Sequence, residues 1–394
     1  MTRMVSSAYK IIRRVLLMAV LFMLSSCYEK LKVEDVITRT VIVYIAADNN
    51  LTTNANPNIY SMSSSMTNGM DDLNLIVFVD QKNIKPSLLR VHDHKIDTIM
   101  TYPEMDSTDP AVLGEVIDYV INEYDSESYG LILWSHGQGW LPTSQLHFVA
   151  PNLNYVQSRS KAFAWEDDYK NNPPYRCMDI EEMASVIPDG LFDFIVFDAC
   201  YMGCVEVAYA LRNKADYIVS SCYEIVSYGF PYHIVTKDFL NGNLLKACRE
   251  YHTYYNKMTS WEQMAGISLV KTDGLDSLAR CFGKIVAGFQ DSIPRMDVSN
   301  VQCFDRYRNH VFFDLEDMVD KLGPSEKYLT EFRLQLEKCI PYKISTPYIF
   351  PGDREQIKVN SYCGLSVYVP LSSYDASGLN ADYRKTEWSI DTGY

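Results

Sequence analysis

The sequence has 394 residues, a formal net charge of −14, 47% hydrophobic residues and 22% charged residues. This apolar content is enough for a sizeable core, which excludes a mostly disordered chain. The length fits two or three domains, or one large α/β domain with additions. The acidic balance argues against a nucleic-acid-binding protein, because it leaves little positive charge to neutralise a phosphate backbone.

The first 26 residues have the pattern of an export signal. Four basic residues precede Val15–Leu24, an apolar run of ten residues that is too short to span a bilayer permanently. The run ends in Leu-Ser-Ser-Cys at Cys27, which resembles the lipobox of bacterial lipoproteins. We therefore expect Cys27 to be acylated, with palmitate among its lipids, and to anchor an exported protein in the cell envelope, at the outer membrane or the cell surface. The alternative is an ordinary cleaved signal peptide that happens to end in Cys.

Continuous apolar runs follow a short polar tether at residues 27–38, and each run predicts a buried strand. In chain order these strands are Thr40–Ala47, Leu73–Asp80, a small hairpin of Leu88–Val91 and Ile96–Thr101, Tyr129–Trp134, Phe192–Phe197 and Tyr217–Ser220. Helical patterns lie between them at Ser107–Asn122 and Met202–Asn213. Buried strands that are separated by helices indicate a three-layer α/β fold, with a mostly parallel sheet covered on both faces.

After about residue 270 the alternation of strands and helices weakens. Helical stripes at 275–289 and 312–322 precede a late apolar run at 364–370, which predicts one more strand. We therefore expect residues 39–270 to form the core and residues 271–394 to form a C-terminal subdomain that packs on the same sheet.

Two of the predicted strands end in residues with catalytic potential, His136-Gly137 and Asp198-Ala199-Cys200. The carboxyl ends of parallel strands meet at one edge of a sheet, so these groups are expected to lie together. We expect a helix to start directly after Cys200, and the dipole of that helix would lower the pKa of the thiol. His136 could then act as general base, and the N–H of Gly137 could approach a developing oxyanion. Taken singly, each of these two residues has a structural explanation. A buried Cys commonly serves only in packing, and a His at the end of a strand is commonly a hydrogen-bonded residue without a catalytic role.

Together with their strand contexts, these residues resemble the clostripain-like cysteine peptidases, in the group that includes caspases, legumains and gingipains. The segments that carry the resemblance are Thr40–Leu51, Tyr129–Trp140, Phe192–Val207 and Ala215–Tyr232. It runs from about residue 39 to near the C-terminus, and it implies a caspase-like fold and endopeptidase activity on protein or peptide substrates.

The resemblance also implies a role for each site residue. Cys200 corresponds to the nucleophile, His136 to the catalytic histidine, and the N–H groups of Gly137 and Cys200 to the oxyanion hole. Asp198 corresponds to the acid of the S1 pocket, which gives a preference for Arg or Lys before the scissile bond, since a desolvated carboxylate favours a cationic partner. The alternative role for Asp198 is the N-cap of a helix that starts near Ala199.

The chain departs from the family at Ser221–Tyr232, which should form one wall of the substrate pocket, so the P1 preference is less secure than the catalytic pair. Members of the family are often matured by self-cleavage between the catalytic His and Cys. Here the polar segment Leu141–Ile180 would contain the cleavage site, and its candidate residues are Arg159, Lys161, Lys170 and Arg176.

No cofactor or metal site is predicted. Some family members depend on calcium, but the acidic run at 166–168 lacks the oxygen spacing of a calcium loop. The nine cysteines after Cys27 show no zinc-ligand spacing. A serine hydrolase and a nucleotide-binding protein are disfavoured, because the sequence has no G-x-S-x-G elbow, no G-x-G-x-x-G turn and no Walker loop. The remaining rival is a catalytically silent surface lipoprotein that keeps the fold in order to bind protein or glycan.

Overall fold

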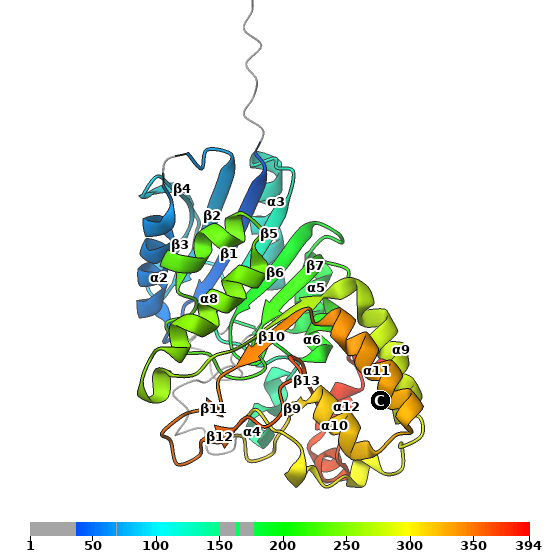
Figure 1. Cartoon of the computed structure of the whole chain (residues 1–394). Helices are drawn as coiled ribbons and strands as arrows, with labels where there is room; N and C mark the ends of the chain where they lie inside the picture. Colours follow the sequence, from blue (N-terminus) through cyan, green and yellow to red (C-terminus); the bar gives the residue numbers. More distant parts are fainter. Residues whose placement is uncertain (1–36, 68, 150–162, 165–176) are drawn as a thin grey trace, which may run out of the picture. The chain divides into compact units, whose positions relative to one another are not determined.

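The computed structural model describes residues 37–67, 69–149, 163–164 and 177–394 (Figure 1). The expected signal segment, the lipid attachment at Cys27 and most of the tether lie outside these residues. Within the described part of the chain, no helix is both long enough and apolar enough to cross a membrane.

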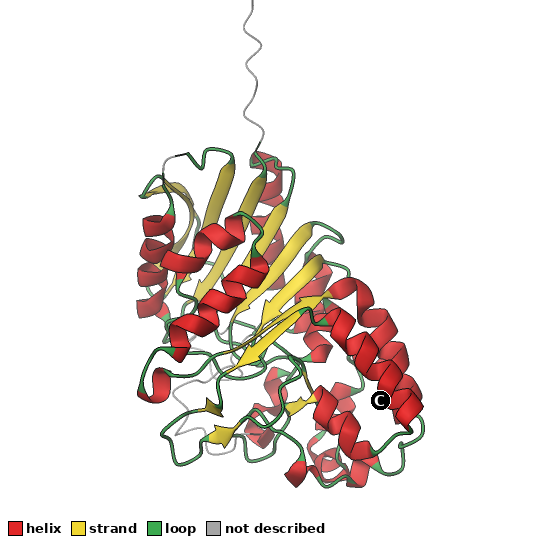
Figure 2. Ribbon diagram, viewed as in Figure 1, coloured by secondary structure: helices red, strands yellow, loops and turns green. Residues whose placement is uncertain are grey.

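The central sheet has nine strands among the described residues, in the order β10-β8-β7-β6-β5-β1-β2-β3-β4. Strands β2, β1, β5, β6 and β7 run parallel to their neighbours within this group, and both edges of the sheet are antiparallel (Figure 2). The bounds are β1 Arg39–Ala47, β2 Leu73–Gln81, β3 Ile84–His92, β4 Lys95–Thr101, β5 Tyr129–Trp134, β6 Phe192–Asp198, β7 Ala215–Ser220, β8 Gly266–Lys271 and β10 Tyr342–Ser345.

Helices cover both faces of this sheet, which confirms the predicted three-layer α/β fold (Figure 1). One group consists of α2 (Thr52–Ser65), α7 (Tyr232–Leu240) and α8 (Leu244–Asn256), and the other of α3 (Pro110–Glu123), α5 (Ile180–Val186) and α6 (Val205–Ala210). The inner strands β1, β5 and β6 are almost entirely buried. Their continuous apolar sequences match this environment, because both faces of each strand pack against helices.

The C-terminal part of the chain contributes β10 to the central sheet and five helices beside it. The helices are α9 Leu275–Val286, α10 Leu315–Leu322, α11 Glu326–Cys339, α12 Leu379–Tyr383 and α13 Glu387–Thr392. Two short sheets complete this part, β9 (Phe313–Asp314) with β13 (Ser366–Val367) and β11 (Tyr348–Ile349) with β12 (Ile357–Lys358).

The late apolar run forms a much shorter strand than predicted. Only Ser366–Val367 is a strand, and it pairs with β9 outside the central sheet. The backbone N–H of Ser366 donates to the carbonyl oxygen of Gly203, and that of Tyr368 donates to Oε1 of Glu206. These backbone groups are therefore satisfied by the segment around α6, so burial of this run does not require a sheet neighbour.

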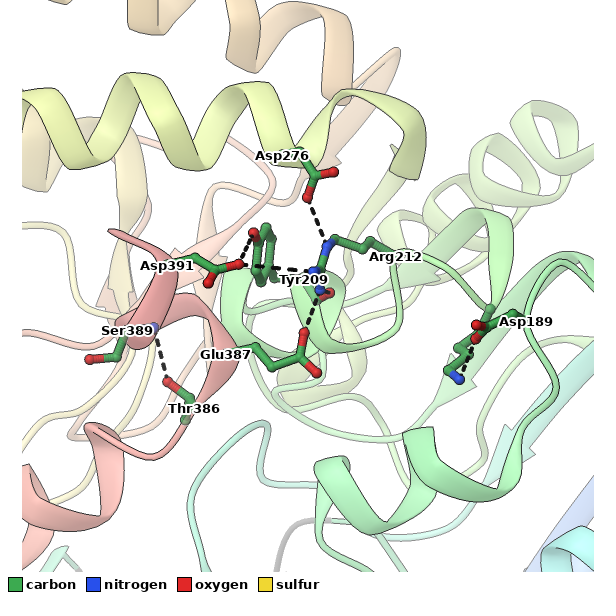
Figure 3. Close-up of polar contacts among 9 residues, drawn as sticks. Asp189, Tyr209, Arg212, Asp276, Thr386, Glu387, Ser389 and Asp391 are labelled. Carbon is green, nitrogen blue, oxygen red and sulfur yellow. Dashed lines mark hydrogen bonds and ion pairs between the residues drawn. The ribbon is translucent and has the colours of Figure 1, made fainter. Parts of the chain in front are cut away.

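An ion-pair network around Arg212 joins α6 to the C-terminal helices (Figure 3). The Arg212 guanidinium lies 2.8 Å from a carboxylate oxygen of Asp276 and 2.5 Å from one of Glu387, and it stacks 3.8 Å from the centre of the Tyr209 ring. The Tyr209 hydroxyl donates to Asp391 over 2.6 Å. The network thus fixes α9 and α13 against the helix that follows Cys200 in the chain.

Candidate active site

The ends of β5 and β6 lie side by side and bring the two predicted catalytic segments together. Trp134 is the register partner of Asp198, and the N–H of Ser135 donates to the Asp198 carbonyl oxygen over 3.3 Å. Beyond the strands the two backbones stay close, because a Cβ atom placed on Gly137 would lie 2.5 Å from the carbonyl oxygen of Cys200. Any side chain at position 137 would therefore push the two strand ends apart, which explains the glycine.

His136 is almost fully buried, and Asn50 fixes the orientation of its ring. Nε2 of His136 lies 2.8 Å from Oδ1 of Asn50, in the turn that follows β1. An amide oxygen only accepts hydrogen bonds, so Nε2 carries the proton and, in the neutral ring, Nδ1 is left as the basic nitrogen. The turn is itself fixed, because Asn49 Oδ1 accepts from the Leu51 N–H and the Ser135 hydroxyl donates to Ala46.

Cys200 does not lie at a helix N-terminus, so this prediction was wrong. Helix α6 begins at Val205, and its N-cap residue is Cys204. Between them the chain makes a turn in which Tyr201 has a φ of +59° and the N–H of Gly203 donates to Ser221. Cys200 therefore lies outside the first turn of α6, where the predicted stabilisation of a thiolate by the helix dipole was placed.

The thiol of Cys200 is held as a neutral group in this conformation. Its side chain is 8% exposed, and Sγ accepts a hydrogen bond from the Ile225 N–H over 3.4 Å. Burial raises the pKa of the Cys200 thiol far above its usual range, and the carboxyl groups of Glu224 and Asp198 raise this pKa further. A buried thiol near two acids is a poor nucleophile, because the reactive species is the thiolate.

Asp198 lies in a buried polar position next to the segment that departs from the family pattern. Its Oδ2 accepts from the Phe230 N–H over 3.0 Å and from the Tyr232 hydroxyl over 2.8 Å. Its Oδ1 is buried and has no hydrogen-bond partner among the described residues. Burial raises the pKa of Asp198 to about 7, although these two hydrogen bonds act in the opposite direction.

The alternative role of Asp198 as a helix N-cap is excluded, because Cys204 occupies that position. Gly229 explains how the chain can approach this carboxyl group so closely. It has a φ of +70°, and a Cβ atom there would lie 2.5 Å from Oδ2 of Asp198. The atypical segment thus keeps a glycine where the backbone meets the acid.

A short piece of the segment between His136 and Cys200 pairs with the site. Phe163 forms an antiparallel bridge with Gly137 and another with Met178, and the Ala164 N–H donates to the carbonyl oxygen of His136 over 3.2 Å. The candidate cleavage residues lie outside the described residues. The intervening segment therefore contacts the backbone of the candidate catalytic histidine directly.

One group of potential metal ligands lies close together within the described ranges. It consists of Cys303, Asp305 and His310, whose ligand atoms are all within 4.8 Å of one another. Both oxygens of Asp305 are already used. Oδ1 lies 2.8 Å from His310 Nδ1, and Oδ2 accepts from the N–H groups of Val311 and Phe312. The hydrogen bonds of Asp305 therefore explain its position: the carboxylate holds the backbone of this loop together, and no metal ion is needed to account for it.

A model of the clostripain family matches residues 43–338 of the sequence. The chain belongs to the clostripain family. It is 29% identical over 428 aligned positions to clostripain from Hathewaya histolytica, covering 90% of this chain and 79% of that protein. Members of this family are cysteine peptidases, so the predicted enzyme class is supported at that level.

Two solved structures of family members have the same fold as this chain. An inactive zymogen of a C11 protease from Parabacteroides distasonis is 32% identical, with a TM-score of 0.76, and the match covers 90% of this chain and 97% of that one. A secreted C11 cysteine protease from Bacteroides thetaiotaomicron, in complex with an irreversible peptide inhibitor, is 28% identical, with a TM-score of 0.75 and coverage of 90% and 99%.

Proposed function

We propose that the chain is a cysteine endopeptidase in which Cys200 is the nucleophile and His136 is the general base. The observation that carries this proposal is the convergence of the two strand ends, with the His136 ring oriented by Asn50 so that Nδ1 is basic. Membership of the clostripain family supports the same chemistry.

In the proposed reaction, His136 Nδ1 takes the proton of the Cys200 thiol as Sγ attacks the scissile carbonyl carbon. The N–H groups of Gly137 and Cys200 stabilise the oxyanion that forms on the carbonyl oxygen, a contribution of about 3 kcal/mol for one donor. The imidazolium then protonates the leaving amine, and water hydrolyses the thioester with His136 again as base. Both products leave with the thiol and the neutral imidazole restored.

For specificity, we propose that Asp198 receives the cation of an Arg or Lys side chain at P1. Its buried Oδ1 has no partner among the described residues, so a cationic side chain would satisfy an atom that is otherwise left without a hydrogen bond. Pairing with a cation would also favour the charged carboxylate, which burial disfavours.

We also propose that this conformation is a latent form, matured by self-cleavage between His136 and Cys200. The neutral, buried thiol supports latency, as does the pairing of Phe163 with Gly137. The zymogen structure of a relative supports it by analogy. Cleavage of the intervening segment would allow this pairing to be released and the thiol to be exposed.

The test of the enzyme assignment is hydrolysis of fluorogenic peptides with Arg, Lys, Asp or Ala at P1 by the mature chain. We expect the Arg and Lys peptides to be cleaved, and the Cys200→Ala protein to cleave none of the four. If wild-type protein cleaves no peptide, either untreated or after maturation is mimicked with trypsin that is then fully inhibited, the silent-lipoprotein alternative is favoured.

Asn50 is proposed as a positioning residue for His136. Asn50→Ala removes the acceptor for Nε2–H, so the ring is free to rotate and to change tautomer, and we expect kcat to fall by about 10- to 100-fold. Asn50→Asp keeps an acceptor and should restore most of the activity. It should also shift the acidic limb of the pH–rate profile to higher pH, because a carboxylate stabilises the imidazolium. Equal losses in both variants, with unchanged pH profiles, would indicate a structural role only.

Lipid anchoring through Cys27 is proposed from the sequence. Acyl chains at this position would retain the protein at the membrane, since each buried CH₂ contributes about 0.8 kcal/mol. Cys27→Ser should therefore lack fatty acid by mass spectrometry and move from the membrane fraction to the soluble fraction. Wild-type protein that is already soluble and unacylated would show that residues 1–26 are an ordinary cleaved signal.

A further inference from the structure

Two large aromatic side chains are exposed together beside the candidate site. Tyr228 is 55% exposed and Trp261 is 51% exposed, and their ring centres lie 6.3 Å apart with the planes inclined by 41°. Tyrosine and tryptophan of this kind are enriched at binding surfaces, because they offer a large apolar area with little conformational freedom to lose.

The segment that carries Tyr228 runs from the nucleophile to the specificity acid. At one end the N–H of Ile225 donates to Sγ of Cys200, and at the other Gly229 packs against Asp198, whose Oδ2 also accepts from the next N–H in the chain. Tyr228 lies between these two contacts. The segment therefore lies beside both groups that a bound peptide would have to reach.

The backbone around Tyr228 is fixed from both sides. The Asn54 side chain of α2 donates to the carbonyl oxygen of Ser227 over 2.7 Å, and the Tyr255 hydroxyl of α8 donates to that of Gly229 over 2.5 Å. Trp261 lies in the short turn that follows α8, so the helix that holds Gly229 also leads into the second ring. A binding surface with a fixed backbone loses little entropy when a ligand is bound.

We propose that Tyr228 and Trp261 form a substrate subsite for an apolar side chain, aromatic rings above all, on the same peptide whose basic residue reaches Asp198. The inference rests on the proposed peptidase function and adds a second specificity determinant to it. The occupant is a peptide because the pair is continuous with the segment that contacts Cys200 and Asp198. The side chain is apolar because the exposed faces of both rings present mainly carbon.

The subsite is tested with internally quenched peptides that have Arg at P1 and carry Phe, Leu or Ala in turn at each position from P4 to P3′. At one position, wild-type enzyme should prefer Phe over Ala. Trp261→Ala and Tyr228→Ala should each reduce that preference by about three- to tenfold, while Tyr228→Phe should keep it. Tyr328→Ala is the matched control, because Tyr328 is 42% exposed on α11 and has no ring partner among the described residues. It should leave the preference unchanged.

A binding measurement separates failure of the subsite from failure of the peptidase function. In the Cys200→Ala protein, each Phe peptide is compared with its Ala counterpart by calorimetry. At one position the Phe peptide should bind more tightly, and Trp261→Ala should remove this difference. If binding behaves so but wild type cleaves nothing, the subsite stands and the peptidase function fails. If neither binding nor turnover distinguishes Phe from Ala, or if Trp261→Ala changes neither ratio, the subsite is overturned.

Discussion

Cys200→Ala is expected to abolish peptide hydrolysis by the mature chain, and His136→Ala is expected to do the same. Without Sγ no thioester forms, and without the imidazole the thiol has no base to accept its proton. Losses of about a million-fold in kcat are typical when one member of such a catalytic unit is removed. The double variant should be no less active than either single variant, because the two groups act in the same step.

Matched controls show whether these losses are chemical. Cys281→Ser replaces a half-buried cysteine on α9, and His233→Ala replaces an exposed histidine on α7. Both should keep near wild-type turnover, and all four variants should unfold at temperatures close to that of wild type. Near-normal activity in either Cys200→Ala or His136→Ala would contradict the proposed pair.

The central sheet was predictable because its inner strands are buried on both faces. β1, β2, β5, β6 and β7 appear in the sequence as continuous apolar runs, and the structure places all five side by side. β8 and β10 were not predicted. β10 is a four-residue edge strand with no fully buried residue, and its sequence resembles a loop. Its position depends on pairing with β8, which the local sequence does not encode.

The site was predictable only as far as sheet topology determines it. That His136 and Cys200 follow neighbouring strands is a consequence of the parallel order. The apolar stripe of α6 shows that a helix is present but not where it begins. The positive φ of Tyr201, which delays the helix, cannot be recognised from the pattern of apolar and polar residues. Asn50 was missed for a related reason. An Asn after a strand is most often a turn residue, and only the three-dimensional contact with His136 distinguishes this one.

Asp198→Asn is expected to lower kcat/KM for Arg and Lys substrates by about 30- to 5,000-fold, which corresponds to the 2–5 kcal/mol for removing one partner of a desolvated charge pair. Substrates with a neutral P1 residue should change far less. Asn keeps an oxygen that can accept from Phe230 and Tyr232, so the pocket should remain folded. Equal turnover of Arg and Ala substrates by wild-type enzyme would remove the specificity proposal, and a basic preference that survives in the variant would assign it to another residue.

The pH dependence gives an independent test of the same residue, because burial raises the pKa of Asp198 to about 7. Only the carboxylate pairs with a cation, so the ratio of kcat/KM for Arg over Ala substrates should rise as the pH increases through about 7, and Asp198→Asn should remove this rise.

The stability of the folded protein should change in the opposite direction. Between the unfolded value of 3.8 and about 7 the folded state binds the proton more tightly. Stability is therefore greatest below about pH 4, falls by up to about 4 kcal/mol as the pH rises from about 4 to about 7, and changes little above that. Relative to wild type, Asp198→Asn should then be more stable at pH 8 than at pH 5, as measured by chemical unfolding at both pH values. A difference that does not depend on pH would show that Asp198 does not titrate in this range.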